Sequence, residues 1–495
     1  MRRIGGTAGR WLVIGLGIGV LFTAVPPFRR SAAAQQLDRS QRPAPGPTPS
    51  VSTPAVTKRT LANGLQVWTV TQRELPSVSA SLVIRAGGAQ DGAKGGLAAM
   101  TASLLDEGAG SRNALEFARA VDALGISLGA FADDERTSVS LTTLKRTADS
   151  AFALMGELVT RPAFAAEELE RDRKSRLQAL RQQKDQPTVI ASQTFARKVY
   201  GDTHPYGRPG NGTPATIGAI TRDDITGFYG RFYRPSNAIM VIVGDLTAEE
   251  GMRYAERAFG GWEKGTLPAE AVAVPTRPAA RPAAVYLVDK PGAAQSEIRI
   301  GHPGAARSTD PDFYALQVMN VILGGQFSSR INLNLRESKG FTYGARSSWT
   351  FNRGDGPFVA SAGVFTAKTD SSLVEFLREL NDIRSTRPPT AEEVEFARGV
   401  LIRAYPRRIE TNGAVAAQLA DLAFFGLPES ELSTYLTRIA AVKPADVSRV
   451  ARRYLQPGQF TIVVVGDLSQ IRAGIEALRL GPVTVLDADG VAVAE

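Results

Sequence analysis

The stretch Ala238-Ile-Met-Val-Ile-Val-Gly-Asp-Leu246 decides the fold, because it returns near the end of the chain as Phe460-Thr-Ile-Val-Val-Val-Gly-Asp-Leu468. The closing glycines, Gly244 and Gly466, are 222 residues apart, and an aspartate upstream of each stretch repeats at the same offset. Each copy predicts a helix that leads into a continuous apolar strand. Two matched features at one offset indicate a duplicated domain.

Around these two stretches the sequence alternates between strand and helix patterns. The expected strands are 65–71, 77–85, 133–143, 285–288 and 297–301, and the expected helices are 95–105, 114–124, 151–159, 166–183, 312–323, 391–403, 414–425 and 430–439. Strands mixed with helix pairs predict an α+β sandwich, in which helices cover one face of a sheet.

Segments of biased composition divide the chain. Residues 35–56 are rich in Pro, Ser, Thr and Gln and predict a flexible tether, and a second stretch of this kind, rich in Pro and Ala, separates the halves. The expected order is a signal peptide or membrane anchor (1–34), the tether (35–56), a first domain (57–262), a linker (263–282), a second domain (283–486) and a tail (487–495).

The N-terminus is typical of an export signal. Three early arginines precede an apolar run at residues 11–25, and Ala32-Ala33-Ala34 provides a small-residue cleavage site. The expected location is therefore the periplasm or cell envelope. The alternative is an uncleaved tether to the inner membrane through residues 11–28.

The net charge of +9 does not indicate nucleic-acid binding. Five arginines and no acid lie in residues 1–34, so the export segment carries more than half of the charge. The basic run at 171–176 is mixed in sign and predicts the solvated face of a helix.

Composition restricts the metal chemistry open to the chain. There is no cysteine, which excludes disulfides and thiolate ligands, and the only histidines are His204 and His302. A catalytic zinc ion usually takes three protein ligands, mostly nitrogen or sulfur. We expect a structural place for His204, assign no role to His302, and expect no zinc bound by this chain.

Six short motifs in order resemble the M16 (pitrilysin-like, mitochondrial processing peptidase-like) family of peptidases. They are Gly95-Gly-Leu-Ala-Ala, His204-Pro-Tyr-Gly-Arg-Pro-Gly-Asn-Gly-Thr, Tyr233-Arg-Pro-Ser-Asn, Val243-Gly-Asp, Leu323-Gly-Gly-Gln-Phe-Ser-Ser-Arg and Leu335-Arg-Glu-Ser-Lys-Gly-Phe-Thr-Tyr343. The resemblance implies two homologous M16-like (LuxS/metallohydrolase-like) α+β sandwich domains in a clam-shell arrangement.

The resemblance places a lost metal site in the first domain. Active members carry His-x-x-Glu-His on a helix, where the residues share one face, the histidines bind zinc and the glutamate activates water. Here these positions are Ala99, Ala102 and Ser103, and the position of a further glutamate ligand is Ala179. The expected site is therefore degenerate at all four positions, with no intrinsic catalytic residue.

The resemblance also implies that Arg336 and Tyr343 bind substrate. An arginine can hold a carbonyl or carboxylate, and a tyrosine can donate to a developing oxyanion. The glycine-containing segment 324–329 aligns with the substrate-recognition loop of the non-catalytic processing-peptidase subunit, but as a phosphate loop it fails, since no Gly-Lys-Ser/Thr follows. We expect a helix end and a turn there.

These features predict the non-catalytic subunit of a heterodimeric zinc metalloendopeptidase. A partner with His-x-x-Glu-His would contribute the zinc, and this chain would contribute Arg336, Tyr343 and part of a chamber for peptide substrates. The first alternative is a peptide-binding or scaffolding pseudoenzyme of the bacterial envelope with no role in hydrolysis. The second is a stand-alone hydrolase, which ranks last because no nucleophile motif is present.

Overall fold

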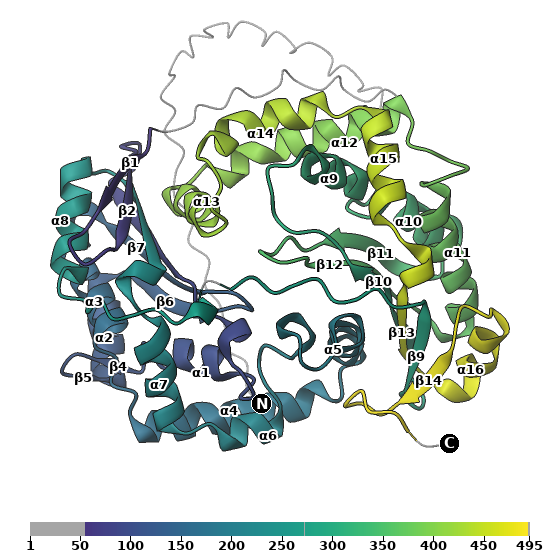
Figure 1. Ribbon diagram of the computed structural model, residues 1–495, viewed down its shortest axis with the longest axis horizontal. Coiled ribbons are helices and arrows are strands. Elements are labelled where there is room, and N and C mark those ends of the chain that lie inside the picture. Colours follow the sequence, from purple (N-terminus) through teal and green to yellow (C-terminus); the bar gives the residue numbers. More distant parts are fainter. Residues whose placement is uncertain (1–54, 272, 494–495) are drawn as a thin grey trace, which may run out of the picture. The chain divides into compact units, whose positions relative to one another are not determined.

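The computed structural model describes residues 55–271 and 273–493, and Figure 1 shows how their elements are arranged. The expected signal peptide or anchor and nearly all of the tether lie outside these residues. Within them, no helix is both long enough and apolar enough to cross a bilayer.

The first half contains a six-stranded sheet in the order β1-β2-β8-β3-β7-β6. Its strands are β1 (Thr57–Thr60), β2 (Gln66–Thr71), β3 (Ser77–Ile84), β6 (Ser127–Ala132), β7 (Thr137–Leu144) and β8 (Ala238–Gly244). The repeated apolar stretch forms β8, which runs parallel to β2 and antiparallel to β3. All its residues are buried, because both faces of the sheet are covered at this strand, and this explains its unbroken apolar sequence.

The second half repeats this sheet, in the order β11-β12-β10-β13-β9-β14. Its strands are β9 (Ala284–Asp289), β10 (Gln295–Pro303), β11 (Thr342–Trp349), β12 (Pro357–Phe365), β13 (Thr461–Gly466) and β14 (Val483–Leu486). Strands β9 to β13 take the places of β2, β3, β6, β7 and β8. Only the outermost strand differs, since β1 precedes its sheet in the chain and is antiparallel to β2, whereas β14 follows and is parallel to β9. The predicted duplication is confirmed.

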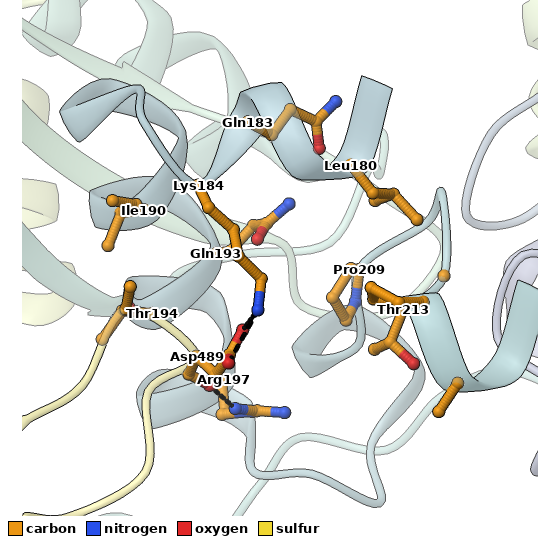
Figure 2. A pocket seen from close by; sticks show the side chains of 14 residues that line it. Leu180, Gln183, Lys184, Ile190, Gln193, Thr194, Arg197, Pro209, Thr213 and Asp489 are labelled. Atoms are coloured by element: carbon orange, nitrogen blue, oxygen red, sulfur yellow. Dashed lines mark hydrogen bonds and ion pairs between the residues drawn. The ribbon is translucent and has the colours of Figure 1, made fainter. Parts of the chain in front are cut away.

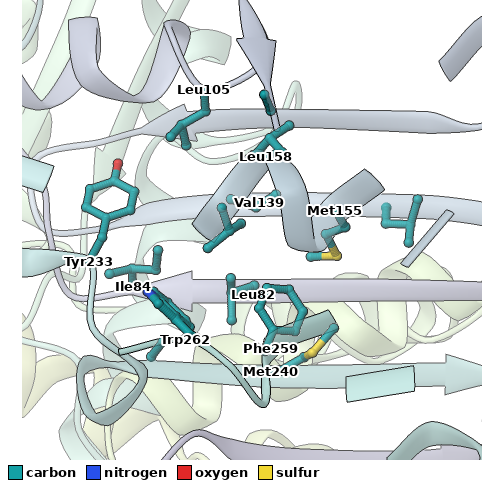
Figure 3. Close-up of a cluster of buried hydrophobic side chains, with 14 of the residues drawn as sticks. Leu82, Ile84, Leu105, Val139, Met155, Leu158, Tyr233, Met240, Phe259 and Trp262 are labelled. Carbon is teal, nitrogen blue, oxygen red and sulfur yellow. The ribbon is translucent and has the colours of Figure 1, made fainter. Parts of the chain in front are cut away.

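Helices cover one face of each sheet and enclose the two main cores. On the first sheet they are α1 (Leu97–Ser103), α2 (Ala114–Leu124), α3 (Ala148–Thr160), α4 (Ala166–Gln183), α6 (Pro214–Ala219), α7 (Arg222–Phe232) and α8 (Ala248–Phe259), and on the second α9 (Pro311–Leu323), α11 (Thr369–Asp382), α12 (Ala391–Ala404), α14 (Ser430–Ala441), α15 (Pro444–Tyr454) and α16 (Leu468–Ala477). In the first core, Leu82 and Met240 of the sheet lie among Met155, Leu158 and Phe259 of the helices (Figure 3). The predicted α+β fold is confirmed.

The opposite face of each sheet is covered by a helix from the other half. Helix α13 (Asn412–Phe424) packs on β3 and β8 of the first sheet, and α5 (Pro187–Tyr200) packs on β10 and β13 of the second. Leu419 of α13 and Phe195 of α5 are buried in these contacts. Each half therefore completes a core of the other, an exchange that the contiguous domain ranges did not anticipate.

Two strands differ locally from the sequence expectations. The strand expected at 133–143 begins only at Thr137, because the Asp133 carboxylate accepts the backbone N–H groups of Glu135 (2.8 Å) and Arg136 (2.9 Å) and closes a turn. His302 lies inside β10 rather than after a strand. Its Nε2 accepts the N–H of Gln456 (3.2 Å), and its Nδ1 bonds the carbonyl of Pro303 (2.8 Å).

The linker between the halves is anchored along its described length. Arg277 donates to the carbonyl of Gly304 and to Asp355, both at 2.9 Å. His204 Nε2 lies 2.9 Å from the carbonyl of Thr276, which gives this histidine the structural place expected for it. The segment is therefore not a free tether at these points.

Candidate functional site

Helix α1, where the lost metal site is expected, is fixed at its start by a buried carboxylate. Asp91 accepts the N–H groups of Gly96 (2.7 Å) and Ala98 (2.8 Å), which no intrahelical carbonyl can reach. Burial raises the pKa of Asp91 to about 7. Gly96 has φ of 94°, and a Cβ there would lie 2.7 Å from a methyl group of Ile217, so only glycine allows α1 to start this close to α6.

The three degenerate positions lie together on α1 as the spacing predicts. Ala102 is 1% exposed, and Ala99 and Ser103 are partly buried. A methyl group has no lone pair to bind a metal and no proton to move, so Ala99 and Ala102 contribute only packing. Ser103 is the single polar side chain of the set.

A partly buried ion pair from α4 lies beside Ala99 and Ser103. Arg176 donates through Nη2 to the Ser103 hydroxyl (2.8 Å) and to the Ala99 carbonyl (3.0 Å), and through Nε to Asp172 (2.6 Å). Ser103 donates in turn to Asp172 (3.2 Å). The guanidinium thus lies against two of the degenerate positions, and its hydrogen bonds hold α1 to α4.

The residues present do not fit a zinc ion at this position. A zinc site needs about three nitrogen, sulfur or carboxylate donors that converge on one point. The carboxylate that contacts Ser103, Asp172, is already paired with Arg176. Across residues 55–271 and 273–493, no group of three or more His, Asp or Glu side chains could hold a metal ion.

Sequence reasoning placed the fourth position at Ala179, which lies on the exposed side of α4. Two other residues of α4, Asp172 and Arg176, contact α1, and neither was expected there. The solvated face predicted for 171–176 is correct for Arg171 but wrong for Arg173 and Arg176. Arg173 turns inward to the carbonyls of Ile217 and Ile220. The usable signal was the Asp–Arg spacing of four, which pairs the two side chains on one helix face.

Arg336 and Tyr343 lie on one continuous segment of the second half. Arg336 belongs to the π-helix η6 (Leu333–Ser338), and Tyr343 to the edge strand β11. The turn between them is closed by the N–H of Gly340, bonded to the Arg336 carbonyl (3.0 Å). Asn334 anchors η6, since its amide donates to both Glu375 (2.8 Å) and Glu379 (2.9 Å) of α11.

The two side chains are held by different aromatic neighbours. The Arg336 guanidinium lies 4.6 Å from the centre of the Phe327 ring and pairs with Glu337 (3.3 Å). Tyr343 is 76% exposed and meets Phe365 edge to face, with 5.8 Å between the ring centres. Among the described contacts, none joins Arg336 to Tyr343 and none joins either to α1. Both donors therefore remain accessible to a ligand.

The segment 324–329 forms the expected helix end and turn, and it also closes a sheet edge. Gly324 ends α9, and its carbonyl accepts the N–H of Ser347 on β11 (3.0 Å). Asn332 Oδ1 accepts the N–H of Ala345 on the same strand (3.1 Å). The corresponding edge strand of the first sheet, β6, has no such partner within the described residues, and its Phe131 is exposed.

A cavity of about 380 Å³ lies beside the end of α4 (Figure 2). It is lined by α4, α5, the loop before α6 and the C-terminal tail. Lys184 lies 2.7 Å from the carboxylate of Asp489, and Arg197 donates to the Asp489 carbonyl. No lining residue comes from α1 or from the Arg336–Tyr343 segment, so this cavity is separate from the candidate site.

Comparisons with known proteins agree with this arrangement. Residues 66–207 match a family model described as Insulinase (Peptidase family M16), and residues 219–401 match one described as Peptidase M16 inactive domain. An uncharacterized zinc protease of Streptomyces coelicolor is 28% identical over 84% of this chain and 91% of its own length. The non-peptidase homolog YmxG of Helicobacter pylori is 23% identical over 79% of this chain and 90% of its own length.

Solved structures show the same fold. The crystal structure of a peptidase M16 inactive domain from Pseudomonas fluorescens superimposes with a TM-score of 0.78 at 27% identity, covering 83% of this chain and 98% of that one. A protease structure from Helicobacter pylori gives a TM-score of 0.78 at 22% identity, covering 83% of this chain and 100% of that one.

Proposed function

The chain belongs to the M16 family of peptidases, as a non-catalytic member that lacks the His-x-x-Glu-His motif, and on this basis we propose that it is one subunit of a heterodimeric zinc metalloendopeptidase. Its partner carries the His-x-x-Glu-His helix and the zinc ion. This chain contributes Arg336 and Tyr343, together with a wall of the chamber that admits peptides. Both subunits work in the periplasm or cell envelope, tethered there if residues 11–28 stay attached.

The observation that carries the proposal is the exposed phenol of Tyr343 in a chain where Arg176 bonds to Ser103, one of the degenerate positions. Burying Tyr343 would gain hydrophobic free energy, so its 76% exposure has a cost unless the side chain meets a ligand. A phenol and a guanidinium are the groups that grip a peptide carbonyl and donate to an oxyanion. With no reacting centre on α1, their use requires one from another chain.

The open strand β6 supports peptide binding. Unpaired backbone groups on an edge strand can accept an extended peptide as an additional strand. Because β11 is closed by Gly324 and Asn332, β6 is the edge that can hold substrate main chain.

The test starts with the tagged chain recovered from its native envelope, followed by mass spectrometry of the proteins that accompany it. We expect a stoichiometric M16 protein with His-x-x-Glu-His. Peptide cleavage by the reconstituted pair is then measured with Arg336→Ala and Tyr343→Phe. Each should lower kcat/KM roughly tenfold or more without preventing assembly, because each removes a donor to the reacting peptide.

Arg119→Ala is the matched control, because Arg119 is exposed on α2, far along the chain from both donors. Cleavage that is unchanged by both test variants would reject the complementation. If the chain is recovered without any such peptidase, but still binds peptides, the alternative of a peptide-binding or scaffolding pseudoenzyme takes its place. Stoichiometric zinc in the purified chain would instead favour a stand-alone hydrolase.

A further inference from the structure

Exposed aromatic side chains gather around Arg336 and Tyr343. Among the described residues, the aromatic side chains in the exposed class are Phe131, Phe327, Tyr343, Phe365 and Phe396. Three of them, Phe327, Tyr343 and Phe365, lie in this one region, which we call the aromatic patch. Tyr343 and Phe365 meet edge to face, and Phe327 lies under Arg336, so exposed aromatic surface flanks both donors. Exposed apolar surface gathered in this way marks a place where a ligand binds.

The aromatic patch is built rigidly although its surface is open. The amide of Asn332 donates to the Phe327 carbonyl (2.7 Å) and accepts the N–H of Ala345 (3.1 Å), so one side chain ties the Phe327 loop to β11. Phe365 donates its N–H to the carbonyl of Phe341 (3.0 Å), which joins the end of β12 to the segment before Tyr343. Rigid aromatic anchors of this kind lose little conformational entropy when a ligand binds.

The charge around the aromatic patch is predominantly positive. Arg336 lies over Phe327, Lys368 lies 5.7 Å from the ring of Phe341, and Arg346 is exposed on β11, three residues after Tyr343. The acid beside them is Glu337, which pairs with Arg336. A guanidinium stacked on a ring keeps its planar donors pointed outward, where they suit a carboxylate. The patch therefore complements a ligand that is both apolar and acidic.

The closed edge of β11 decides how such a ligand binds. The N–H groups of Ala345 and Ser347 are already bonded to Asn332 and to Gly324. A peptide cannot add to this edge as a strand there, so it must be held through its side chains.

We propose that the aromatic patch is a specificity subsite that takes a large apolar side chain of a peptide, with an acidic residue next to it bound by Arg336. The apolar side chain packs between Phe327 and Phe365, and the neighbouring carboxylate meets the guanidinium. This subsite deepens the proposed function and rests on it, because it assumes that Arg336 and Tyr343 face a peptide substrate.

The test measures binding by the purified chain alone, so that it does not depend on a partner. Fluorescence anisotropy compares three labelled peptides that differ only at two central positions: Phe-Glu, Ser-Glu and Phe-Lys. We expect the Phe-Glu peptide to bind best and the other two to bind roughly tenfold more weakly, as for the loss of one hot-spot contact. Equal affinity for all three peptides would overturn the subsite.

Variants then locate the binding. Phe327→Ala and Phe365→Ala should each weaken the Phe-Glu peptide roughly tenfold, while Phe396→Ala should have no such effect. Phe396 is the matched control, since it is 41% exposed against 40% for Phe365 and lies on α12. Because all three side chains are exposed, their loss leaves the cores intact. Equal affinities for Phe365→Ala, Phe327→Ala and Phe396→Ala would reject the patch as the binding surface.

The two proposals fail separately. If the patch variants lose peptide affinity but no His-x-x-Glu-His partner exists, the subsite stands and the heterodimeric function fails. If cleavage by a reconstituted pair depends on Arg336 and Tyr343 but ignores the Phe-Glu sequence, the function stands and the subsite fails.

Discussion

Arg176 should prevent the return of zinc even when the lost ligands are restored. The perturbation is a graft of the family's ligands onto this chain, Ala99→His, Ser103→His and Ala179→Glu, made with Arg176 in place and again with Arg176→Gln. Ala102 is left unchanged, because it is 1% exposed and a glutamate there would be buried without a partner. We expect no zinc in the first protein and one zinc ion per chain in the second.

The size of the expected loss in zinc affinity follows from the position of the Arg176 guanidinium. Arg176 Nη2 lies 2.8 Å from Ser103 Oγ and 3.0 Å from the Ala99 carbonyl. A zinc ion held about 2 Å from imidazole nitrogens at these positions would be on the order of 5 Å from that charge. At an effective dielectric constant of about 20, the repulsion between the guanidinium and a zinc ion at this separation is roughly 7 kcal/mol. The Asp172 carboxylate, which is 2.6 Å from Arg176, attracts the zinc and offsets part of this repulsion, so the net loss of affinity is less than about five orders of magnitude in Kd.

The assay is zinc content after dialysis, measured by mass spectrometry, with calorimetric titration for the affinity. Arg171→Gln in the grafted chain is the matched control, since Arg171 lies on the same helix with its side chain 61% exposed. That protein should stay free of zinc. Far-UV circular dichroism checks that each variant folds, because Arg176→Gln also removes hydrogen bonds that join α1 to α4. Stoichiometric, tight zinc in the graft that keeps Arg176 would refute the reasoning.

Two further predictions concern stability. Burial lowers the pKa of His302 to about 4 from its ordinary value of 6.5. Between these pH values the unfolded state binds more protons than the folded state. The free energy of unfolding is therefore highest above pH 6.5 and falls by about 3 kcal/mol as the pH drops through 4. Urea unfolding at pH 7 and pH 4.5 should therefore show a smaller acid loss in His302→Gln than in the unaltered chain, and an equal loss would contradict the burial of a neutral imidazole. Leu419→Ala, in the helix that the second half lends to the first sheet, should cost about 3 kcal/mol in one cooperative transition, because it opens a cavity in a shared core. Two separate calorimetric transitions would instead mean that the halves unfold independently.

Much of the fold follows from local pattern. The helices expected at 114–124 and 166–183 have these bounds in the structure. The start of the first is set by a reciprocal cap between Asn113 and Glu116, a signal contained in four residues. The duplicated strands β8 and β13 were also readable, because strands covered on both faces are apolar throughout.

Local sequence pattern could not show the contacts between distant parts of the chain. Helix α5 was not predicted, and the partner that buries it is the sheet of the other half. In the same way, Arg176 meets Ser103 across 73 residues of sequence. The degenerate positions could be found by resemblance, but the cation that now occupies their surroundings could only be seen once α1 and α4 were packed together.

The edge strands of the two sheets are not shielded equally, and this affects how the chain behaves in solution. Strand β14 is shielded by the C-terminal tail through the pairing of Leu486 with Ala492, β11 is shielded by Gly324 and Asn332, and β1 is only four residues long and carries Lys58 and Arg59. Strand β6, Ser127-Leu-Gly-Ala-Phe-Ala132, has no charge and no proline. Although α1 packs against it, none of the backbone hydrogen bonds among the described residues covers its outer edge. Such a strand is the point at which a concentrated preparation would begin to self-associate. A single charged substitution there, Phe131→Lys, should therefore do more for solubility than the same change at any shielded edge.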